Sequence, residues 1–353
     1  MINLDDMKIY SQYDPEGMLG RIKELPMQCR QAWEAAMNLK LPDGYADVNK
    51  VVVLGMGGSA IGADLVKSLV AAEAKIPVIV HRDYGMPAFV DEKTLLIASS
   101  YSGNTEETLS GFEPALKTKA KKIAMTTGGR LQQMAEASNI PVFKIEYIAQ
   151  PRAALGFSFM PTLAVMQKLG LIKDKTIDVA ETVRVLEKLA EKLDEESFIA
   201  TNPAKQMAMR LHGCLPVIYG AGIAAEAAHR WKTQINENSK AWAFYEIFPE
   251  LNHNATVGFP LPEDIAHKIR VILLRSPLFN QRVKMRYDVT CELLKQAGVQ
   301  YEFVNSEGVS PMAQMISLVS IGDYVSYYLA ILYKVDPSPV KVISYLKDRL
   351  AKG

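Results

Sequence analysis

The sequence predicts an α/β protein built from two doubly wound parallel-sheet domains. Short, continuously apolar runs of strand length alternate with segments of helical periodicity. Continuous apolar strands separated by helices are typical of a parallel sheet that helices cover on both faces. A chain of 353 residues also exceeds what one hydrophobic core usually organises, so we expect two domains.

The first half of the chain contains five strand-sized apolar runs. We expect strands at residues 51–54, 78–80, 95–99, 123–125 and 142–145. The residues up to about 45 have a helical pattern that ends in a Pro-Asp-Gly turn, and further helices are expected at 106–117 and 153–169. The charged stretch 173–196 is predicted to form a solvated helix that links the two halves.

The second half repeats this plan in a weaker form. Residues 217–228 are similar to residues 52–63, because both have the pattern of a strand, a glycine turn and a helix. Further strands are expected at 269–274 and 301–304, with helices at 283–296, 311–333 and 340–350. The pattern indicates a duplicated domain whose second glycine loop has diverged.

Composition narrows the classes of function. The 40 Lys and Arg residues balance 39 Asp and Glu residues, and no block of like charges occurs, which argues against a nucleic-acid partner or a polybasic membrane arm. The three cysteines are far apart and form no Cys-x-x-Cys pair, as in proteins of a reducing compartment. We find no apolar signal segment and no apolar run near the ~20 residues of a membrane span, so we expect a cytoplasmic protein.

A glycine-rich loop follows the first predicted strand. The run from Gly55 to Gly62 lets the backbone approach a ligand, and the helix that follows offers free N–H groups to an anion. The same run satisfies the Gly-x-Gly-x-x-Ala pattern of dinucleotide-binding loops, or forms a tight turn without a ligand. A dinucleotide site also needs an acidic residue at the end of the second strand, where Asp83 follows His81 and Arg82 and fits poorly.

A second loop, Ser-Ser-Tyr-Ser-Gly-Asn-Thr-Glu-Glu-Thr at residues 99–108, also connects a strand to a helix. Its hydroxyls, Ser100, Ser102 and Thr105, can hold a phosphate dianion at a helix N-terminus without any lysine. Simple helix capping is a viable alternative for Thr105, but it does not explain three hydroxyls in six residues. The two loops together predict a sugar-phosphate pocket.

The densest polar cluster covers residues 230–240 and 249–254. Glu237 lies toward the C-terminal end of a predicted helix, where the helix dipole disfavours a carboxylate and favours its taking up a proton. The alternative is a solvated helix-end carboxylate. His253 lies in the polar sequence Leu-Asn-His-Asn, which favours proton transfer over a core position. No two histidines have the spacing of zinc ligands, so a metal site is not supported.

Two cations remain as candidates. Arg152 follows the fifth predicted strand, and because the carboxyl ends of parallel strands line the ligand crevice, it could face the pocket of the two loops. The alternative is a surface arginine near a helix start. Lys347, in the last predicted helix, is the second candidate, and a solvent-exposed lysine is the stronger alternative there because Lys341 lies in the same segment.

Four of these runs make the sequence resemble a known family. The two loops, the run Arg-Trp-Lys-Thr-Gln-Ile-Asn-Glu-Asn-Ser-Lys and the run Pro-Glu-Leu-Asn-His-Asn are similar to those of the bifunctional phosphoglucose/phosphomannose isomerases. These enzymes consist of two sugar-isomerase (SIS) domains, so the resemblance, which extends from about residue 41 to residue 350, implies two flavodoxin-like three-layer sandwiches. The Asn-Glu-Asn and Leu-Asn-His-Asn runs are its most specific part.

The resemblance implies a role for each candidate. Ser100, Ser102 and Thr105 would anchor the sugar phosphate, with Gly58 and Ser59 beside them. Arg152 would steady an enediolate intermediate, and Glu237 would move a proton between C2 and C1. His253, from the neighbouring subunit of a homodimer, and Lys347 would assist ring opening. No metal or cofactor is implied.

The sequence therefore predicts a metal-independent aldose–ketose isomerase that interconverts glucose 6-phosphate and mannose 6-phosphate with fructose 6-phosphate. A non-catalytic SIS protein that senses sugar phosphates and a nucleotide-dependent dehydrogenase are the alternatives. The expected division is an N-terminal helical segment at 1–40, a first SIS domain with the sugar-phosphate pocket at 41–170, a linker helix at 171–198, and a second SIS domain with the catalytic loops and the C-terminal helix at 199–353.

Overall fold

The structure is a computed structural model that describes residues 2–350. Within these residues the chain divides into two compact units. The first unit comprises residues 24–187 and 307–316, and the second comprises the remaining described residues up to 23, from 188 to 306 and from 317 onward.

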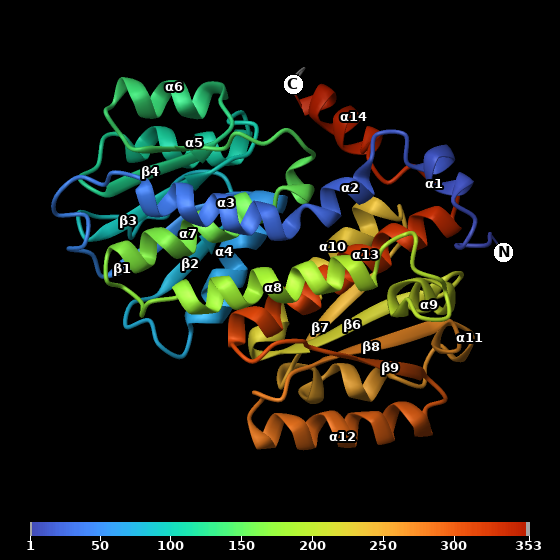
Figure 1. The fold of residues 1–353 in the computed structure, drawn as a ribbon. Coiled ribbons are helices and arrows are strands. Elements are labelled where there is room, and N and C mark those ends of the chain that lie inside the picture. Colours follow the sequence, from blue (N-terminus) through green and yellow to red (C-terminus); the bar gives the residue numbers. More distant parts are fainter. Residues whose placement is uncertain (1, 351–353) are drawn as a thin grey trace. The chain divides into compact units, whose positions relative to one another are not determined.

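The first unit contains a five-stranded sheet in the order β2-β1-β3-β4-β5, and every neighbouring pair is parallel (Figure 1). Its strands are β1 (Lys50–Leu54), β2 (Val78–His81), β3 (Thr94–Ser99), β4 (Lys121–Thr126) and β5 (Val142–Lys144). Its helices are α3 (Leu25–Asn38), α4 (Gly57–Val70), α5 (Glu106–Ala115), α6 (Gly129–Ala137), the 3-10 turn η1 (Pro151–Ala153) and α7 (Gly156–Lys168). Strand β3 is buried along its whole length, as expected for a central strand covered on both faces.

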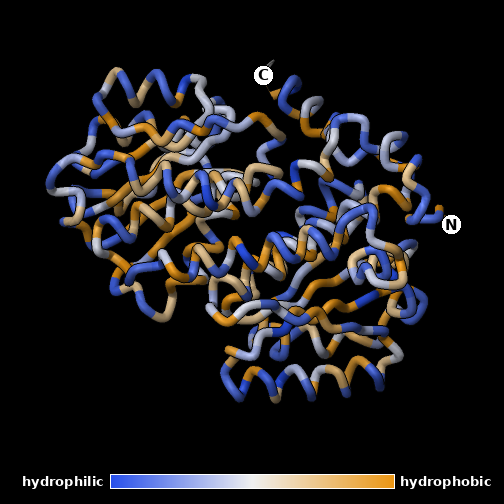
Figure 2. The backbone as a smooth tube through the Cα atoms, in the orientation of Figure 1, coloured by the Kyte–Doolittle hydropathy of each residue, from blue (hydrophilic) through white to orange (hydrophobic). Residues whose placement is uncertain are grey.

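Helices cover both faces of this sheet. On one face, Leu109 and Phe112 of α5 and Leu131 of α6 join strand residues such as Leu96 in one apolar core. Helices α4 and α7 pack on the opposite face, and α3 packs against α7 (Figure 1). Figure 2 shows how the hydrophobic residues concentrate in the strands between these layers.

The second unit contains a four-stranded parallel sheet in the order β7-β6-β8-β9. Its strands are β6 (Leu215–Ala221), β7 (Phe244–Phe248), β8 (Ile269–Arg275) and β9 (Gln300–Asn305). Its helices are α1 (Lys8–Tyr13), α2 (Met18–Lys23), α9 (Pro203–Leu211), α10 (Ala225–Asn238), α11 (Glu263–Ala266), α12 (Gln281–Gln296) and α14 (Lys341–Leu350), with 3-10 turns η2 (Gly222–Ala224), η3 (Glu250–His253) and η4 (Ala255–Gly258). Two further helices, α8 (Thr176–Lys192) and α13 (Pro311–Leu332), cross the division between the units.

The prediction of two parallel doubly wound α/β sheets is confirmed, and in each sheet the first strand of the unit lies next to the third. Strand β7 was not expected, because its sequence Phe-Tyr-Glu-Ile-Phe lies between two polar runs and is not continuously apolar. As an edge strand, β7 leaves Phe244 and Glu246 partly accessible, so it lacks the apolar signature of a central strand. Helices α6 and α9 were also not expected.

The linker segment differs from its prediction as a solvated helix. Helix α8 is amphipathic, and Val179, Val183, Leu186 and Leu189 are each at most 5% exposed. These residues recur at spacings of three and four, which is the pattern of a helix with one buried face. The charged residues between them suggested full solvation, but they occupy only the outer face.

Helix α13 (Pro311–Leu332) confirms the helix expected at 311–333, but it corrects the expectation that no apolar stretch approaches the length of a membrane span. It spans 22 residues with a mean hydropathy of 1.5 over its most apolar window, so it is long and apolar enough to cross a membrane by length and composition. That window is entirely buried within the structure, which is the environment of a core helix. Asp323 is the single charged residue of α13.

Helices α10 and α13 lie in close contact within the second unit. Gly322 gives the room for this approach, because a Cβ added there would lie 2.3 Å from Nε1 of Trp231. Trp231 Nε1 donates to the Leu318 carbonyl at 2.7 Å. Beside it, the Arg230 guanidinium forms a two-pronged ion pair with Asp323, at 3.1 Å and 2.7 Å. Burial raises the pKa of the Asp323 carboxyl, and Arg230 opposes that rise.

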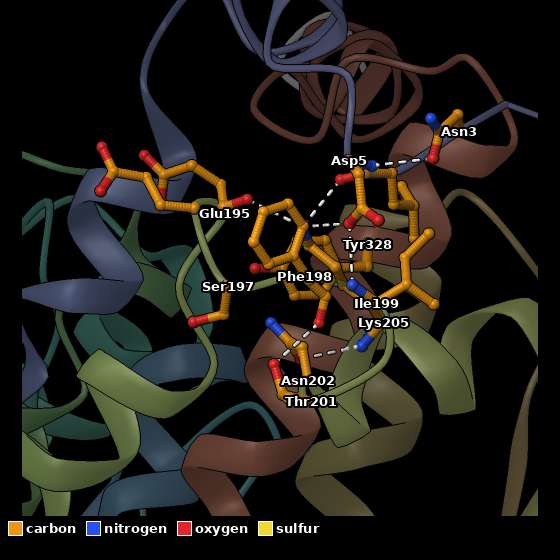
Figure 3. A network of polar contacts seen from close by, with 12 residues as sticks. Asn3, Asp5, Glu195, Ser197, Phe198, Ile199, Thr201, Asn202, Lys205 and Tyr328 are labelled. Atoms are coloured by element: carbon orange, nitrogen blue, oxygen red, sulfur yellow. Dashed lines mark hydrogen bonds and ion pairs between the residues drawn. The ribbon is translucent and has the colours of Figure 1, made fainter.

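A buried lysine fastens the N-terminal residues to the second unit (Figure 3). Lys205 is fully buried, and its Nζ donates to the carbonyls of Leu4 and Glu195, each at 2.7 Å. The Asp5 carboxylate lies 3.5 Å from the same nitrogen and also accepts from the Ile199 N–H at 2.8 Å. Burial lowers the pKa of Lys205, and the nearby Asp5 charge opposes this. The first residues therefore belong to the second unit.

The Arg230–Asp323 pair gives a stability prediction. Replacing Arg230 by Met leaves a buried carboxylate without its cation, and we expect the free energy of unfolding to fall by about 3–5 kcal/mol. Arg210→Met is the matched control, because Arg210 pairs with Glu302 in the same unit at 2.7 Å but is 48% exposed. The control should lose less than about 1 kcal/mol in urea unfolding followed by circular dichroism. Equal losses in the two variants would contradict a special role for the buried pair.

Candidate active site

The glycine loop joins β1 to α4 and approaches the Arg152 turn closely. Gly57 has φ +49°, a conformation that glycine adopts without strain. A Cβ added to Gly58 would lie 2.8 Å from the Pro151 carbonyl oxygen and 3.0 Å from the Arg152 nitrogen. Gly58 is therefore required for backbone packing, which sequence reasoning did not show. This packing brings the Arg152 turn to the glycine loop.

The hydroxyl loop follows β3 and is held by its own side chains. Ser100 is buried, and its Oγ lies 2.8 Å from Oγ1 of Thr105. Thr105 occupies the N-cap position of α5 but makes no side-chain capping bond, so simple capping does not account for its hydroxyl. Ser102 is exposed, and its Oγ accepts from the Asn104 N–H at 3.2 Å. The first turn of α5 thus lacks a side-chain cap and lies beside the three hydroxyls, an arrangement suited to an anion.

Ser59 connects the two loops. Its Oγ accepts from the Tyr101 N–H at 3.1 Å, and its carbonyl accepts from Ser99 Oγ at 3.4 Å. Ser59 is 8% exposed. Its hydroxyl therefore has a structural partner and fixes the hydroxyl loop against the start of α4.

The hydroxyl loop is also packed against the loop after β4. Gly103 has φ +67°, and a Cβ added there would lie 1.8 Å from the Gly128 carbonyl oxygen. Gly129 is similarly crowded, because its added Cβ would lie 2.5 Å from the Ser102 carbonyl oxygen. The three glycines allow the two backbones to touch, and this contact sets the shape of the loop.

Arg152 is 3% exposed, so the alternative of a surface arginine is wrong. It lies in η1, which Gln28 of α3 holds with its amide group. Gln28 Nε2 donates to the Ala153 carbonyl at 2.8 Å, and Gln28 Oε1 accepts from the Gly156 N–H at 3.2 Å. Gln28 is fully buried. Sequence reasoning missed this residue, because nothing in the sequence connects it to a turn more than 120 residues away.

Glu237 lies in the last turn of α10, as predicted, and is half-buried. The two residues that follow it attach this end of the helix to Ser326 of α13. Asn238 Nδ2 donates to Ser326 Oγ at 3.0 Å, and Ser239 Oγ donates to the Ser326 carbonyl at 2.6 Å. The Glu237 backbone is therefore held in place, and its side chain is half-buried.

A pocket of about 610 Å³ opens beside Glu237 within the second unit. Its wall is formed by polar residues at and just after the end of α10 and by the segment that leads into α14, among them Asn236, Glu237, Lys240, Pro339, Val340 and Lys341. Lys240 Nζ donates to the carbonyls of Glu237 at 2.5 Å and Pro337 at 2.9 Å. Lys240 belongs to the polar run that the sequence singled out, but its place in this pocket follows from the tertiary structure.

His253 is the last residue of η3, after strand β7, and is exposed. The preceding Asn252 fixes the turn to α12, because its Nδ2 donates to Thr290 Oγ1 at 2.9 Å and its Oδ1 accepts from Arg286 at 3.2 Å. The imidazole thus stands on a well-anchored turn and faces away from the apolar core of the unit. This agrees with the prediction that His253 is not a core histidine.

Lys347 is exposed on α14, a helix with no buried residue. Lys341, at the start of the same helix, lies in the wall of the Glu237 pocket, whereas Lys347 does not. Glu237, His253 and Lys347 lie on three different elements, α10, η3 and α14. Contacts of Gly58 and Ser59 connect the three predicted segments of the first unit, whereas the three predicted residues of the second unit lie on α10, η3 and α14.

Both halves of the chain match known domain families. Residues 44–167 match the SIS domain, and residues 200–350 match the bacterial phospho-glucose isomerase C-terminal SIS domain. Among solved structures, a glucose-6-phosphate isomerase like protein from Thermus thermophilus has a similar fold, with a TM-score of 0.63 and 18% identity over 97% of this chain and 100% of that chain. The fold and the matches define a protein of two SIS domains.

Curated relatives show which family of two-SIS-domain proteins this chain is similar to. The bifunctional phosphoglucose/phosphomannose isomerase of Caldicellulosiruptor bescii is 46% identical over 95% of this chain and 99% of its own length. The enzyme of the same name from Aquifex aeolicus is 38% identical over 86% of this chain and 90% of its own length. This chain belongs to the bifunctional phosphoglucose/phosphomannose isomerase family.

The contact between the two glycine-rich backbones predicts the effect of a single methyl group. In Gly103→Ala, the alanine has to adopt the strained positive φ of Gly103, and its Cβ clashes with the Gly128 carbonyl. We therefore expect the free energy of unfolding of the first unit to fall by at least about 3 kcal/mol. Gly44→Ala is the control, because Gly44 has φ +80° with nothing within 4 Å of an added Cβ. The control should lose only about 1–2 kcal/mol from backbone strain. Urea unfolding measures both, and similar losses would refute the close packing.

Proposed function

We propose that this chain catalyses the interconversion of glucose 6-phosphate and mannose 6-phosphate with fructose 6-phosphate. The observation that carries the proposal is the arrangement in the first unit, where three hydroxyls and an uncapped helix start lie close to a turn that holds a buried arginine. Membership of the isomerase family supports the choice of substrates. Nothing in the comparisons favours a non-catalytic sugar-phosphate sensor.

The hydroxyl loop is the proposed phosphate site. Ser100, Ser102 and Thr105 supply O–H donors, and the first turn of α5 supplies backbone N–H groups whose dipole favours a dianion. Because these local groups are the proposed binding groups, the site needs no positive field from the whole chain. This agrees with the net charge of the chain, which is only +1. Binding the phosphate orients the sugar carbons, and that orientation lowers the barrier at the reacting end.

Glu237 is the proposed base for proton transfer between C2 and C1. In the open-chain aldose, removal of the C2 proton gives a cis-enediolate. Protonation of O1, loss of the O2 proton and delivery of the abstracted proton to C1 then complete the isomerisation. Negative charge develops on the oxygen in the first of these steps, and the Arg152 guanidinium is the group proposed to stabilise it. Acceptance of both epimers requires only that the site tolerate either configuration at C2.

Ring opening precedes this step and needs a separate proton donor and acceptor. His253 and Lys347 are the residues proposed for it, with His253 supplied by the neighbouring subunit of a homodimer. The exposed position of His253 leaves it accessible to a second chain. Exposed apolar residues also occur on α12 (Met285, Val289 and Leu293, spaced by four) and on α14, which supports association of two copies.

The remaining sequence-based expectations stay predictions. These are the domain division at residues 40, 170 and 198, independence of a metal, and a cytoplasmic location. The three cysteines are all unpaired in the structure, which fits a reducing compartment. Cys29 is buried, and burial raises its thiol pKa to about 12, so it is not a reactive nucleophile.

The proposed activity predicts a direct result. The purified chain in excess EDTA should convert fructose 6-phosphate into a product that glucose-6-phosphate dehydrogenase oxidises, and mannose 6-phosphate should give the same product. Glu237→Gln should lower kcat by at least about 1,000-fold, because the amide cannot accept the proton, while binding of the phosphate ester changes little. Glu113→Gln, on the exposed face of α5, is the matched control and should remain active.

Two outcomes would contradict this proposal. A folded wild-type chain that produces no glucose 6-phosphate would exclude the isomerase, and the sensor alternative would then predict sugar-phosphate binding without turnover. Full activity of the Glu237→Gln variant would exclude Glu237 as the base and leave the rest of the proposal intact.

Sharing of His253 between subunits predicts complementation. Glu237→Gln and His253→Ala chains, each nearly inactive alone, should recover activity when they are co-expressed in equal amounts and purified as one unselected mixture. Random pairing makes half of the dimers mixed, with one of two sites complete, so the mixture should reach about a quarter of the wild-type specific activity. No gain over the average of the two variants would show that Glu237 and His253 act within one chain, and a monomer in light scattering would exclude the dimer.

A further inference from the structure

Tyr101 lies between Ser100 and Ser102, and its side chain reaches out of the hydroxyl loop to the segment before Arg152. Its phenol oxygen accepts from the Ala149 N–H at 2.8 Å and donates to the Tyr147 carbonyl. Both partners are backbone groups of the chain that leads into η1. A single oxygen thus connects the proposed phosphate loop to the segment that carries the proposed oxyanion-stabilising arginine.

The backbone of Tyr101 is fixed on its other sides. Its N–H donates to Ser59 Oγ at 3.1 Å, and its carbonyl accepts from Thr127 N and Thr127 Oγ1 at 2.9 Å and 2.7 Å. Tyr101 therefore contacts the glycine loop, the loop after β4 and the segment before Arg152 at once. A movement of the hydroxyl loop has to be passed on to these neighbours or break the bonds.

The segment from Tyr147 to Arg152, here called the arginine segment, is short. It is also held on the side away from the Tyr101 phenol. Only two residues separate Ala149 from Arg152. On the far side of the turn, Gln28 holds the Ala153 carbonyl and the Gly156 N–H, and its Nε2 also lies 3.1 Å from the Tyr147 hydroxyl. The Tyr147 hydroxyl in turn donates to Glu24 at 2.5 Å. The Tyr101 phenol thus connects the hydroxyl loop by hydrogen bonds to a segment that Gln28 and Glu24 anchor from α3 and the residue before it.

We propose that Tyr101 is a positioning residue that couples phosphate binding to the placement of Arg152. This inference rests on the proposed function and adds a residue to which sequence reasoning gave no role. Phosphate bound to the hydroxyl loop holds the phenol in place, the phenol holds residues 147–149, and Arg152 takes the position that stabilises the enediolate. Binding energy from the unreactive end of the substrate is used in this way at the reacting end.

The phenol-to-phenyl variant separates coupling from simple support of the loop. Tyr101→Phe removes one oxygen and leaves the ring and the backbone bonds of the loop in place. We measure the dissociation constants of inorganic phosphate, which needs only the loop, and of a sugar-phosphate hydroxamate, whose planar anionic group mimics the enediolate and also needs Arg152. The kcat and KM for fructose 6-phosphate are measured alongside. Tyr45→Phe is the matched control, because Tyr45 donates to the Lys122 carbonyl at 3.0 Å in the same unit.

We expect Tyr101→Phe to bind inorganic phosphate within about two-fold of the wild type, while hydroxamate affinity and kcat each fall about 10- to 100-fold, the cost of a misplaced catalytic group. Tyr45→Phe should change none of these values. Parallel loss of both ligands would show a structural role only, and unchanged hydroxamate affinity and kcat would show no role; either result overturns the coupling. A wild-type chain that binds phosphate and hydroxamate but does not turn over would overturn the proposed function, and the coupling with it.

Discussion

Direct contact between backbones at the carboxyl edge of the first sheet is the constraint on which the proposed site depends. Gly58 admits the Arg152 turn, and Gly103 admits the loop after β4, each at a distance where a Cβ would clash. Three loops that follow β1, β3 and β4, together with the turn after β5, can therefore share one small region. Parallel strands make this possible because all their carboxyl ends lie at the same edge. Close packing in this way places hydroxyls, the start of α5 and the turn that holds the buried Arg152 near one another, which is the basis of the proposed anion site.

The second unit uses the same strand order for a different purpose. Its glycine turn after β6 leads into α10, and Glu237, the proposed base, lies at the far end of that helix. The contact of α10 with α13, through Trp231 over Gly322 and the Arg230–Asp323 pair, determines where that end lies. The long apolar helix α13 is thus the support for the proposed base. A duplicated fold has kept its framework while its two copies carry different groups.

Sequence patterns predicted most of the strands and helices. The errors occurred where the buried side of an element could not be recognised from the sequence. Every continuously apolar strand was found, because a strand covered on both faces has no polar positions. The edge strand β7 was missed because one of its sides is accessible. The charges of α8 were misread as full solvation, since composition alone does not show which face of a helix is buried. Helix α13 was expected, but the length of its apolar stretch was not recognised. Of the candidate residues, Ser100, Thr105 and Glu237 stood out because their polar character was unexpected where they occur, whereas Gln28 and Tyr101 did not.

The sequence by itself determined the fold class, the family and the residue types that the chemistry needs, because these depend on local patterns of polarity and on short runs such as Asn-Glu-Asn. Only the tertiary structure decided that Arg152 is buried, that Ser59 has a structural partner, that Lys341 lies beside Glu237 where Lys347 does not, and that Tyr101 connects two loops. These facts depend on contacts between residues far apart in the chain. Such contacts are set by how helices and loops pack, and no local pattern records them.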